Sequence, residues 1–566
     1  AVPRQTGVSG DLRKRWTKRP ARGAEEEPRT LETRSAEEDS RAPGISGAGE
    51  NPWTPGIFRA AALLAAVFLV SGCAGKNVPS ETEPPRGGLQ EEVSEHSPRY
   101  DLREENSELP SCYDPREESL KLPSRYDLRE EISMLPAADQ GDLGTCWAFA
   151  SLAAVETSMA EEDRARLSAD HMIWQNGFGT GTDGGDYGMA MAYLLAWKGP
   201  VLEEQDPYGD GMSPEGLEPV CHVQEIRILP EKDYEAIKRA VYEYGGVESA
   251  VYIPADFGKT GAGELEAGEF WTGEALCYQG TQEANHDIVI VGWDDHYPKE
   301  NFSAKPEADG AFLCLNSWGS GFGEDGYFYV SYEDSQIGVY GISYSGLEDA
   351  DHYSRIYQTD LRGWTGQMGY GSSSAWFANV YTAQETERIA ACGFYATVPD
   401  TSYRVYGAVL PEEPGGAESS AQPTGEEPFG EKLPEKELSG KEPPGAEKRS
   451  DIETAFADRN LLAEGTLSYA GFYTISWEDG LLAEEDSRFA LLVEIDSPGT
   501  AQPVAVEYGE DSRGGNRRDV DIPDGEGYIS FDGKSWQSAE ENGGSRVCLK
   551  AYSRSIEKES RESNGA

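Results

Sequence analysis

Basic residues are scarce in this chain. Its 566 residues include 49 lysines and arginines against 102 aspartates and glutamates, which gives a formal net charge of −53 at pH 7. Because a field of this sign repels polyanions, the net charge excludes attraction to nucleic acid or to an anionic membrane surface. We therefore expect no nucleic acid partner. Long stretches rich in Glu, Pro and Gly further predict disordered segments between the folded regions.

Cysteines are also few. Eight occur in the whole chain, and no two have the C-x-x-C spacing of a zinc cluster. The sequence therefore predicts no metal and no cofactor. Eight cysteines in a chain of this length do not make a dense disulfide framework either. Cys392 and Cys548 are the candidate pair in the C-terminal region, whereas Cys314 lies in an apolar run that is typical of a buried, unreactive thiol.

The apolar run at residues 60–70 is too short to cross a bilayer, because a spanning helix needs about 20 residues. Arg59 precedes the run, and the sequence V-S-G-C at residues 70–73 closes it. This pattern is typical of a lipoprotein signal peptide, with Cys73 as the lipidated residue. A plain secretory signal cleaved nearby and a short uncleaved anchor are the alternatives. The run predicts an exported protein, anchored to the cell membrane by lipid or located on the extracellular surface.

We assign residues 1–73 to a leader and signal peptide, and we exclude them from the fold. The part before the apolar run, residues 1–56, is long for a signal peptide, carries charges of both signs and begins with Ala rather than Met. We interpret it as a misassigned start or a translated upstream region.

Three separated motifs carry candidate catalytic residues in the order Gln, Cys, His, Asn. A thiol needs a base to become a good nucleophile, and the base needs an orienting partner. Cys146, His286 and Asn316 can supply these three roles. Gln140, six residues before the cysteine, adds an amide that could stabilise an oxyanion. Each residue alone is more typical of a buried thiol, a core histidine or a turn, but the combination indicates catalysis. The motifs are QGDLGTCWAFA at 140–150, NHDIVIVGWDD at 285–295 and NSWGSGFGEDGY at 316–327.

The local sequence predicts how these residues are carried. Residues 148–160 contain small and apolar residues without Pro or Gly, which predicts a helix with Cys146 at its N-terminus. The helix dipole and a nearby imidazolium would both favour the thiolate there. Short β-branched and aromatic runs at 288–293, 311–315 and 326–332 predict buried strands around the histidine and the asparagine.

The motifs resemble those of the papain-like (C1) cysteine proteases, whose pattern around the nucleophile is Q-G-x-C-G-S-C-W-A-F. His286 follows Cys146 by 286 − 146 = 140 residues, and Asn316 follows after 316 − 286 = 30 more. The first spacing falls within the roughly 130–150 residues of papain-type enzymes. The resemblance covers residues 122–346. It implies an α+β protease of two subdomains, a helical one that carries the cysteine and a β-rich one that carries the other two residues.

The resemblance also implies roles around the site. His286 would be the proton shuttle, Asn316 would hold its ring, and Trp318 would shield their hydrogen bond from water. Residues 167–185 are similar to the family's L-S-x-Q-x-L-x-D-C … G-C-x-G-G stretch. This likeness implies that Gly184 and Gly185 let the substrate backbone approach closely, because no Cβ intrudes. The family's paired cysteines are replaced by Leu143 and Thr182, so that bridge is absent here.

One departure from the family concerns substrate preference. The residue after the catalytic histidine is usually a small Ala in the wall of the S2 pocket, but here it is Asp287. Tyr187 is expected to lie near Asp287. The predicted substrate-binding residues also include Asn285 and Trp318. A carboxylate in this wall predicts a preference for Arg or Lys over Leu or Phe at the P2 position of the substrate. The alternative is that Asp287 turns away into a local salt bridge.

A tandem repeat precedes the protease-like region. Repeat 1 (RYDLREENSELPS) begins at Arg99, repeat 2 (CYDPREESLKLPS) at Cys112 and repeat 3 (RYDLREEISMLPA) at Arg125. Family members often begin their mature domain with a similar L-P-x-x-Y-D-L-R segment, so repeat 3 is expected to belong to the folded domain. Residues 74–121 are then a low-complexity linker, and repeats 1 and 2 form a stalk. The alternative is that they compete for the docking groove of repeat 3.

The C-terminal region has a different residue pattern. Short aromatic and β-branched runs separated by turn residues predict an antiparallel β-sandwich over residues 351–553. It resembles the lectin-like domain found after bacterial C1 peptidase domains. A Pro-, Glu-, Gly- and Lys-rich stretch at 411–450 predicts a disordered insertion, and residues 554–566 a disordered tail. Trp364, Trp376 and Trp536 are candidates for stacking on sugars, although each alone is more typical of a core residue.

The sequence therefore predicts an exported papain-like cysteine endopeptidase that acts on protein or peptide substrates. The sandwich would serve adhesion or substrate docking, through a cell-surface glycan or protein. The first alternative is an inactive protease fold used as a surface binding protein. A second is another Cys–His enzyme, such as a cell-wall amidase, which the Gln–Cys–His–Asn order disfavours. Because no catalytic motif lies beyond residue 346, the sequence also predicts that the protease region alone cleaves small peptides.

Overall fold

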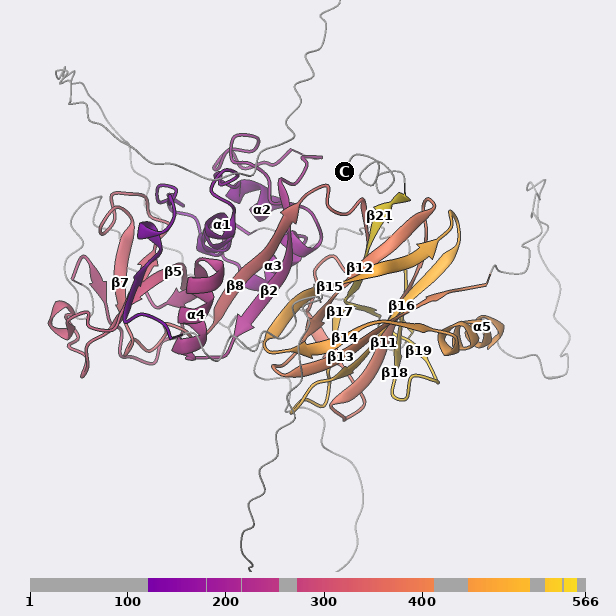
Figure 1. The fold of residues 1–566 in the computed structure, drawn as a ribbon. Coiled ribbons are helices and arrows are strands. Elements are labelled where there is room, and N and C mark those ends of the chain that lie inside the picture. The colour runs from indigo at the N-terminus through magenta and orange to yellow at the C-terminus, as the bar shows by residue number, and fades with distance from the viewer. Residues whose placement is uncertain are drawn as a thin grey trace, which may run out of the picture. The chain divides into compact units, whose positions relative to one another are not determined.

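The computed structural model describes residues 121–179, 181–214, 216–253, 272–411, 446–508, 525–541 and 544–556 (Figure 1). The predicted leader, Cys73, repeat 1 and residues 112–120 of repeat 2 lie outside these residues, as does most of the predicted insertion. Within the described ranges, no helix is both long and apolar enough to cross a membrane.

The N-terminal part of the described chain contains a helical group and a β-rich group. The helices are α1 (Cys146–Ser158), α2 (Ala169–Gln175), α3 (Tyr187–Leu195) and α4 (Tyr234–Tyr244), with 3₁₀ turns at Leu128–Glu130 and Lys299–Asn301. The strands are β1 (Arg125–Asp127), β2 (Cys221–Leu229), β3 (Val247–Val251), β4 (Ala275–Leu276), β5 (His286–Asp294), β6 (Ala311–Leu315), β7 (Tyr327–Ser331) and β8 (Gly341–Asp349).

Helix α1 is buried on nearly all sides. Its sequence CWAFASLAAVETS is almost entirely small or apolar, and such a helix belongs in the interior rather than on a surface. It contacts α3 and the strands β5 and β8. The predicted helix is confirmed, and Cys146 is its first residue. Burial of α1 against β5 places the cysteine beside the strand that begins with His286.

The predicted strands around the histidine and asparagine are confirmed. They lie in the order β4-β7-β6-β5-β3-β8-β2, and β1 pairs with β5. Neighbouring strands in this order are antiparallel, except for the short parallel pair of β4 and β7. The sheet is therefore mixed, with α1 and α4 in contact with its central strand β5. Since β5 pairs with β6, with Val289 opposite Leu315, the start of β5 lies next to the end of β6.

The C-terminal part is a sandwich of antiparallel strands, as predicted. One layer is a six-stranded sheet in the order β14-β13-β16-β11-β18-β19, and the other contains β15-β12-β21-β9. Buried side chains of both layers form one core. The elements are β9 (Arg355–Tyr357), β10 (Gly366–Met368), β11 (Ser374–Thr382), β12 (Glu387–Ala396), β13 (Thr401–Val409), α5 (Ala446–Ala457), β14 (Asn460–Leu467), β15 (Ala470–Ala483), β16 (Arg488–Asp496), β17 (Val504–Tyr508), β18 (Glu526–Ser530), β19 (Gln537–Ser538), β20 (Ser545–Val547) and β21 (Leu549–Ser555).

The sequence did not predict that β2 and β15 pair. Residues 470–473 of β15 lie antiparallel to residues 225–228 of β2, so one sheet of 12 strands runs through both parts of the chain. Gly471 makes this approach possible, because a Cβ there would lie 2.0 Å from the Ile226 carbonyl oxygen. Its φ of 139° is also one that L-residues rarely adopt. Phe472 joins the buried core that contains α1.

Several expectations for the C-terminal part are wrong. Cys392 and Cys548 are both free and buried, so they do not pair. For the tryptophans, the placement named as more typical of each is confirmed at two positions: Trp376 and Trp536 are only 9 % and 1 % exposed and are core residues, whereas Trp364 is half-buried. The physical reason is that helix α5 covers the face of the six-stranded sheet opposite the sandwich core, and Trp376 and Trp536 pack there with Ile452 and Phe456 of that helix. In addition, helix α5 begins at residue 446, inside the predicted insertion, and β21 extends to residue 555, inside the predicted tail.

Candidate active site

The three motifs converge on one site. Cys146 begins α1, His286 begins β5, and Asn316 directly follows β6. The backbone N–H of Asp287 hydrogen-bonds the sulfur of Cys146, which joins the start of the helix to the start of β5. The structure therefore brings the nucleophile candidate and the base candidate together across the boundary between the helical and β-rich groups.

Asn316 fixes the orientation of the histidine ring. The Nε2 atom of His286 lies 2.8 Å from Oδ1 of Asn316. The same Oδ1 accepts a hydrogen bond of 2.8 Å from the backbone N–H of Ser317, which identifies this atom as the oxygen of the amide. Since Oδ1 can only accept, Nε2 carries the proton in the neutral ring. Nδ1 is then unprotonated and able to take a proton from a thiol.

Trp318 covers the histidine. Its ring centroid lies 4.7 Å from that of His286 at an interplanar angle of 32°, and Phe322 packs edge-on against the indole at 4.9 Å. His286 is 7 % exposed and Asn316 is 3 % exposed. The hydrogen bond between them is therefore shielded from water, which strengthens it in the low local dielectric.

Burial favours the uncharged forms of Cys146 and His286. It raises the pKa of Cys146 to about 12, and the negative charge of Asp287 adds to that effect, while the backbone N–H groups of Asp287 and Trp147 lower it. Burial lowers the pKa of His286 to about 4, against the opposing effect of its hydrogen bond to Asn316. The expectation that the helix terminus would favour the thiolate is thus reversed for the isolated thiol. A thiolate–imidazolium pair has no net charge, so proton transfer within the site avoids creating a single buried ion.

Gln140 lies next to the start of α1 and is held on several sides. Its Oε1 accepts a hydrogen bond of 2.6 Å from the Ser317 hydroxyl, and its Nε2 donates to the Leu143 carbonyl at 2.8 Å. One amide hydrogen on Nε2 remains for a further acceptor. No motif pointed to the role of Tyr208, whose hydroxyl donates to the Gln140 carbonyl and contacts the Thr145 hydroxyl, both at 2.8 Å. Tyr208 thereby ties the Gln140 loop to the residue before Cys146.

The two glycines differ in what they accommodate. Gly184 has a φ of 126°, and a Cβ built there would meet nothing within 4 Å, so its surroundings are open. At Gly185 an added Cβ would lie 2.5 Å from the indole ring of Trp147, the residue after the nucleophile. Gly185 therefore permits close packing of Trp147. Of the two, Gly184 alone has open space for a substrate backbone.

Two buried acids lie beside the cysteine, and the motifs identified only the first. Asp287 is 6 % exposed, and its carboxylate accepts a hydrogen bond from the Tyr340 hydroxyl. Glu248 of β3 is fully buried, and its Oε2 accepts hydrogen bonds from Ser151 of α1 at 2.9 Å and from Tyr344 at 2.6 Å. The other oxygen of Glu248 has no hydrogen-bond partner among the described residues. Burial raises the pKa of both carboxyl groups, that of Asp287 to about 7.

Of the remaining predicted substrate-binding residues, one lies near Asp287 and one is bonded to the backbone elsewhere. Tyr187, the first residue of α3, packs its ring 5.1 Å from that of Tyr340, so it lies near Asp287 as expected. Asn285 instead uses its side chain on the backbone of Ile253, accepting from its N–H at 2.8 Å and donating to its carbonyl at 2.7 Å. Those bonds position the chain just before the histidine.

The buried Asp287 leads to a prediction for stability against pH. An unfolded aspartate has a pKa near 3.9, whereas burial raises the folded value to about 7. The folded state therefore holds the proton between these values, and the stabilisation that is present below pH 4 is lost as the pH rises through 7. We expect Asp287→Asn, which stays neutral, to unfold at a higher temperature than the natural chain at pH 8 and at a similar temperature at pH 4. Thermal unfolding between pH 4 and 8 tests this difference.

The exposed Asp142 supplies the matched control for that measurement. Asp142→Asn removes the same charge without a buried carboxyl, so its unfolding temperature should follow the natural chain across the whole range. A constant offset between Asp287→Asn and the natural chain at every pH would contradict the prediction.

Two known family patterns match this chain, one in its N-terminal part and one in its C-terminal part. The pattern of the papain family cysteine proteases matches residues 122–347, and that of a lectin-like domain matches residues 356–427 and 447–553. The chain contains a papain-family cysteine protease domain and a lectin-like domain. Within the protease domain, the match spans Gln140, Cys146, His286 and Asn316 together.

Curated relatives of the chain match about a third of its length. The gamete and mating-type specific protein A of Dictyostelium discoideum is 27 % identical over 210 residues, which are 36 % of this chain and 42 % of that protein. Pro-cathepsin H of Mus musculus is 27 % identical over 211 residues, which are 36 % of this chain and 58 % of that protein. The chain thus spans about half the length of these relatives.

Solved structures of the clostridial cysteine protease Cwp84 share both domains of the fold. A structure determined after propeptide cleavage has a TM-score of 0.60 and 22 % identity, and covers 76 % of this chain and 100 % of the other. A structure of the protease and lectin-like domains of Cwp84, a surface layer associated protein of Clostridium difficile, has a TM-score of 0.58 and 22 % identity. It covers 77 % of this chain and 89 % of the other. At this identity the likeness establishes the fold.

Proposed function

We propose that this chain is an exported cysteine endopeptidase that uses Cys146 as nucleophile and His286 as the proton-transferring base. The observation that carries the proposal is the contact of His286 Nε2 with Asn316 Oδ1, because it leaves Nδ1 as the basic nitrogen. The amide oxygen also accepts from Ser317, which holds this oxygen in place, so a flipped ring would lose its hydrogen bond to Asn316. The papain-family match supports the same roles.

The proposed reaction has two halves. The Cys146 thiol passes its proton to Nδ1 of His286, and the sulfur bonds to the carbonyl carbon of the scissile peptide. The carbonyl oxygen becomes an oxyanion that accepts from the Cys146 backbone N–H and the remaining amide hydrogen of Gln140. His286 then gives its proton to the leaving amine as the peptide C–N bond breaks. Water, deprotonated by the same histidine, hydrolyses the thioester and restores the thiol.

The alternative is a papain-like fold that binds without cleaving. The raised pKa of Cys146 keeps this alternative open, because a protonated thiol is a poor nucleophile. An epoxide or vinyl sulfone that alkylates thiols distinguishes the two functions. We expect rapid modification at Cys146 and none at the buried Cys314, with peptide cleavage lost in proportion. Peptide cleavage that survives complete labelling of Cys146 would refute the proposed nucleophile.

Asp287 supports a proposal for substrate preference. It lies beside the nucleophile, and Asp186 adds negative potential around it. A guanidinium or ammonium group entering this region would gain partners that an apolar side chain leaves unsatisfied. We expect substrates with Arg at P2 to exceed matched Leu substrates in kcat/KM by about tenfold, or about 1.4 kcal/mol.

The measurement compares kcat/KM for two peptides that differ only at P2, in the natural chain and in Asp287→Ala. The variant should lose the preference for Arg while its rate on the Leu peptide changes little. A natural chain that prefers Leu, with no shift in the variant, would show that Asp287 only serves its hydrogen bond to Tyr340.

Export and anchoring are proposed from the signal-like sequence that ends at Cys73. The similarity to Cwp84, which is described as surface layer associated, supports a surface location. We expect the full protein to partition into the detergent phase of a Triton X-114 separation, and Cys73→Ser to release it to the aqueous phase. Finding the natural protein only in culture supernatant would support a plain secretory signal. We further propose that the lectin-like domain docks a cell-surface glycan or protein for the protease.

A further inference from the structure

The sequence of repeat 1 matches that of repeat 3, which is part of the protease domain. Residues 99–105 and residues 125–131 are both RYDLREE, identical at all seven positions. The repeats start 112 − 99 = 13 and 125 − 112 = 13 residues apart, so the spacing is constant. Repeat 2 keeps the pattern but has Cys112 in place of the first Arg and Pro115 in place of the Leu.

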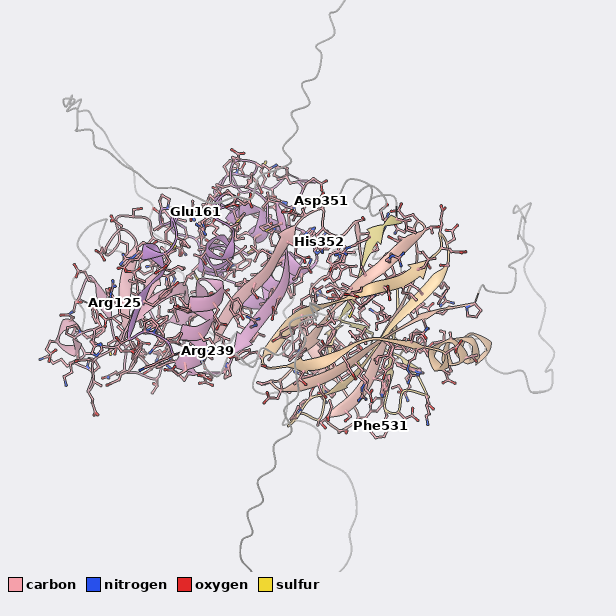
Figure 2. All side chains as sticks on the ribbon, viewed as in Figure 1. Arg125, Glu161, Arg239, Asp351, His352 and Phe531 are labelled. Carbon is pink, nitrogen blue, oxygen red and sulfur yellow. The ribbon has the colours of Figure 1, made fainter. Side chains whose placement is uncertain are left out.

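Repeat 3 docks along the edge of β5. Arg125, Tyr126 and Asp127 pair antiparallel with Asp294, Trp293 and Gly292 in turn, and Arg125 is labelled in Figure 2. The backbone of the segment just before it also takes part. The Trp293 indole N–H donates to the Pro123 carbonyl, and the Asp295 N–H donates to the Ser124 carbonyl, both at 2.9 Å.

The side chains of repeat 3 fill the same surface. Tyr126 packs its ring 5.1 Å from the rings of both Tyr242 and Trp293. Leu128 is 4 % exposed and belongs to the core that contains α1. The Arg129 guanidinium lies over the Tyr327 ring at 4.7 Å and within 3.4 Å of Glu324. We call this surface, formed by residues 292–294 with Tyr242, Tyr327 and Glu324, the β5 groove.

The β5 groove is shaped for a backbone at close range. A Cβ added to Gly292 would lie 2.4 Å from the Tyr126 carbonyl oxygen, so only glycine lets this strand approach. Within repeat 3, the buried Asp127 carboxylate accepts from Arg129 Nε at 3.0 Å and Nη2 at 2.8 Å, which fixes the turn after the strand. These contacts use the Tyr, Asp, Leu and Arg of the repeat, and repeat 1 carries all four.

We propose that repeat 1 is a second ligand for the β5 groove and exchanges with repeat 3 of the same chain. Repeat 1 offers Tyr100, Asp101, Leu102 and Arg103 in the order that the groove contacts. Repeat 2 binds less well, because the smaller Pro115 takes the place of the buried Leu128 and loses part of its apolar contact.

Exchange within one chain outweighs exchange between chains. Repeats 1 and 3 are 125 − 99 = 26 residues apart, a separation that a flexible chain spans with an average reach of roughly 30 Å. Such a tether gives repeat 1 an effective concentration in the millimolar range at its own groove, far above ordinary protein concentrations. A trans-docked repeat on a second molecule has no such advantage.

The exchange has a direction and a consequence for the site. Repeat 3 continues into Ile132 and Met134, which pack on the core, whereas repeat 1 has Asn106 and Glu108 there. Repeat 3 is therefore the favoured occupant. It also leads within a few residues to Asp139, which bridges to Trp318, and to Gln140. When repeat 1 is docked, repeat 3 is released from β5. The side-chain amide of Gln140, which is proposed to bind the oxyanion, is then held less firmly because the segment before it is no longer anchored.

Disulfide trapping tests which repeat occupies the groove. In repeat 3, Arg125 lies opposite Asp294 in the strand register. All full-length chains carry Cys146→Ala to prevent cleavage, and Asp294→Cys as the reporter. The two test chains also carry Tyr126→Ala to weaken repeat 3. The repeat 1 chain adds Arg99→Cys and Cys112→Ser, while the repeat 2 chain uses its natural Cys112. The positive control tests whether repeat 3 itself crosslinks. It keeps Tyr126 and carries Arg125→Cys, Asp294→Cys and Cys112→Ser.

After mild oxidation and peptide mapping, we expect a crosslink between positions 99 and 294 within monomers of the repeat 1 chain. It should exceed the crosslink between positions 112 and 294 of the repeat 2 chain by about tenfold or more, because repeat 2 lacks the buried leucine. A positive control that crosslinks while the repeat 1 chain does not would overturn the proposal. Crosslinks found only in dimers, and lost on dilution, would overturn exchange within one chain.

A second measurement needs no cysteine. We expect Tyr100→Ala to leave thermal stability unchanged alone but to lower it further in the Tyr126→Ala background, while Tyr113→Ala adds little there. Equal unfolding temperatures for Tyr126→Ala with and without Tyr100→Ala would show that repeat 1 does not replace repeat 3.

Discussion

Replacing Cys146 with alanine is expected to abolish peptide hydrolysis, a loss on the order of 10⁴–10⁶ in kcat. The proposed reaction has no other group to form the thioester, so what remains is only the contribution of binding and of the oxyanion donors. Stability should hardly change, because Ala is favourable in a helix and the substitution removes a thiol that burial keeps neutral. Steady-state cleavage of a fluorogenic peptide measures kcat, and thermal unfolding measures the change in stability.

Cys314→Ala is the matched control. This thiol is free and fully buried in β6, so its loss leaves a small cavity and lowers the unfolding temperature without touching the site. The two variants should thus show opposite profiles, one inactive and stable, the other active and less stable. Full hydrolysis by Cys146→Ala would remove the basis of the proposed function.

Gln140→Ala is expected to lower kcat by roughly 10²–10³ with little change in KM. The amide hydrogen that remains on Nε2 would donate to the oxyanion, a species that exists only after the sulfur has attacked. Loss of this donor should therefore affect the transition state more than substrate binding.

Gln140 also holds the Ser317 hydroxyl, so a structural effect must be separated from a catalytic one. Ser317→Ala removes that hydrogen bond and leaves the amide donor in place. We expect Ser317→Ala to retain most of the kcat of the natural chain. If both variants lose kcat equally and unfold at equally lower temperatures, Gln140 acts only by positioning the loop.

The local structure around the candidate catalytic residues could be predicted because each of their motifs is contiguous in sequence. A helix without Pro or Gly begins at Cys146, and short apolar strands flank His286 and Asn316, so local patterns sufficed to place all three. Glu248 could not be found in this way. It is a single acid in the strand VESAV, and its partners Ser151 and Tyr344 lie 97 and 96 residues away.

Ionisation was the part of the site least accessible to prediction. A helix terminus predicts a lowered pKa for Cys146, but enclosure by α1, β5 and the neighbouring acids raises it. Enclosure depends on every side chain around the sulfur, and most of these come from distant segments. The same limit applies to Trp376 and Trp536 of the sandwich, because their burial depends on helix α5, which covers that face of the six-stranded sheet.

The pairing of β2 with β15 changes what can be cut from this protein. Removal of everything beyond residue 347 would strip Ala470–Tyr473 from the outer side of β2 and take Tyr395 and Phe472 out of the core around α1. The edge of β2 would then be unpaired, and it would lie next to the cavities left by the two aromatic side chains. Such an unpaired edge is a template for strand addition between molecules. The shortened enzyme would therefore precipitate rather than cleave small peptides, contrary to what the position of the motifs alone predicts. A soluble minimal enzyme has to keep β15 together with its partner strand β12, or carry charged substitutions along the outer edge of β2.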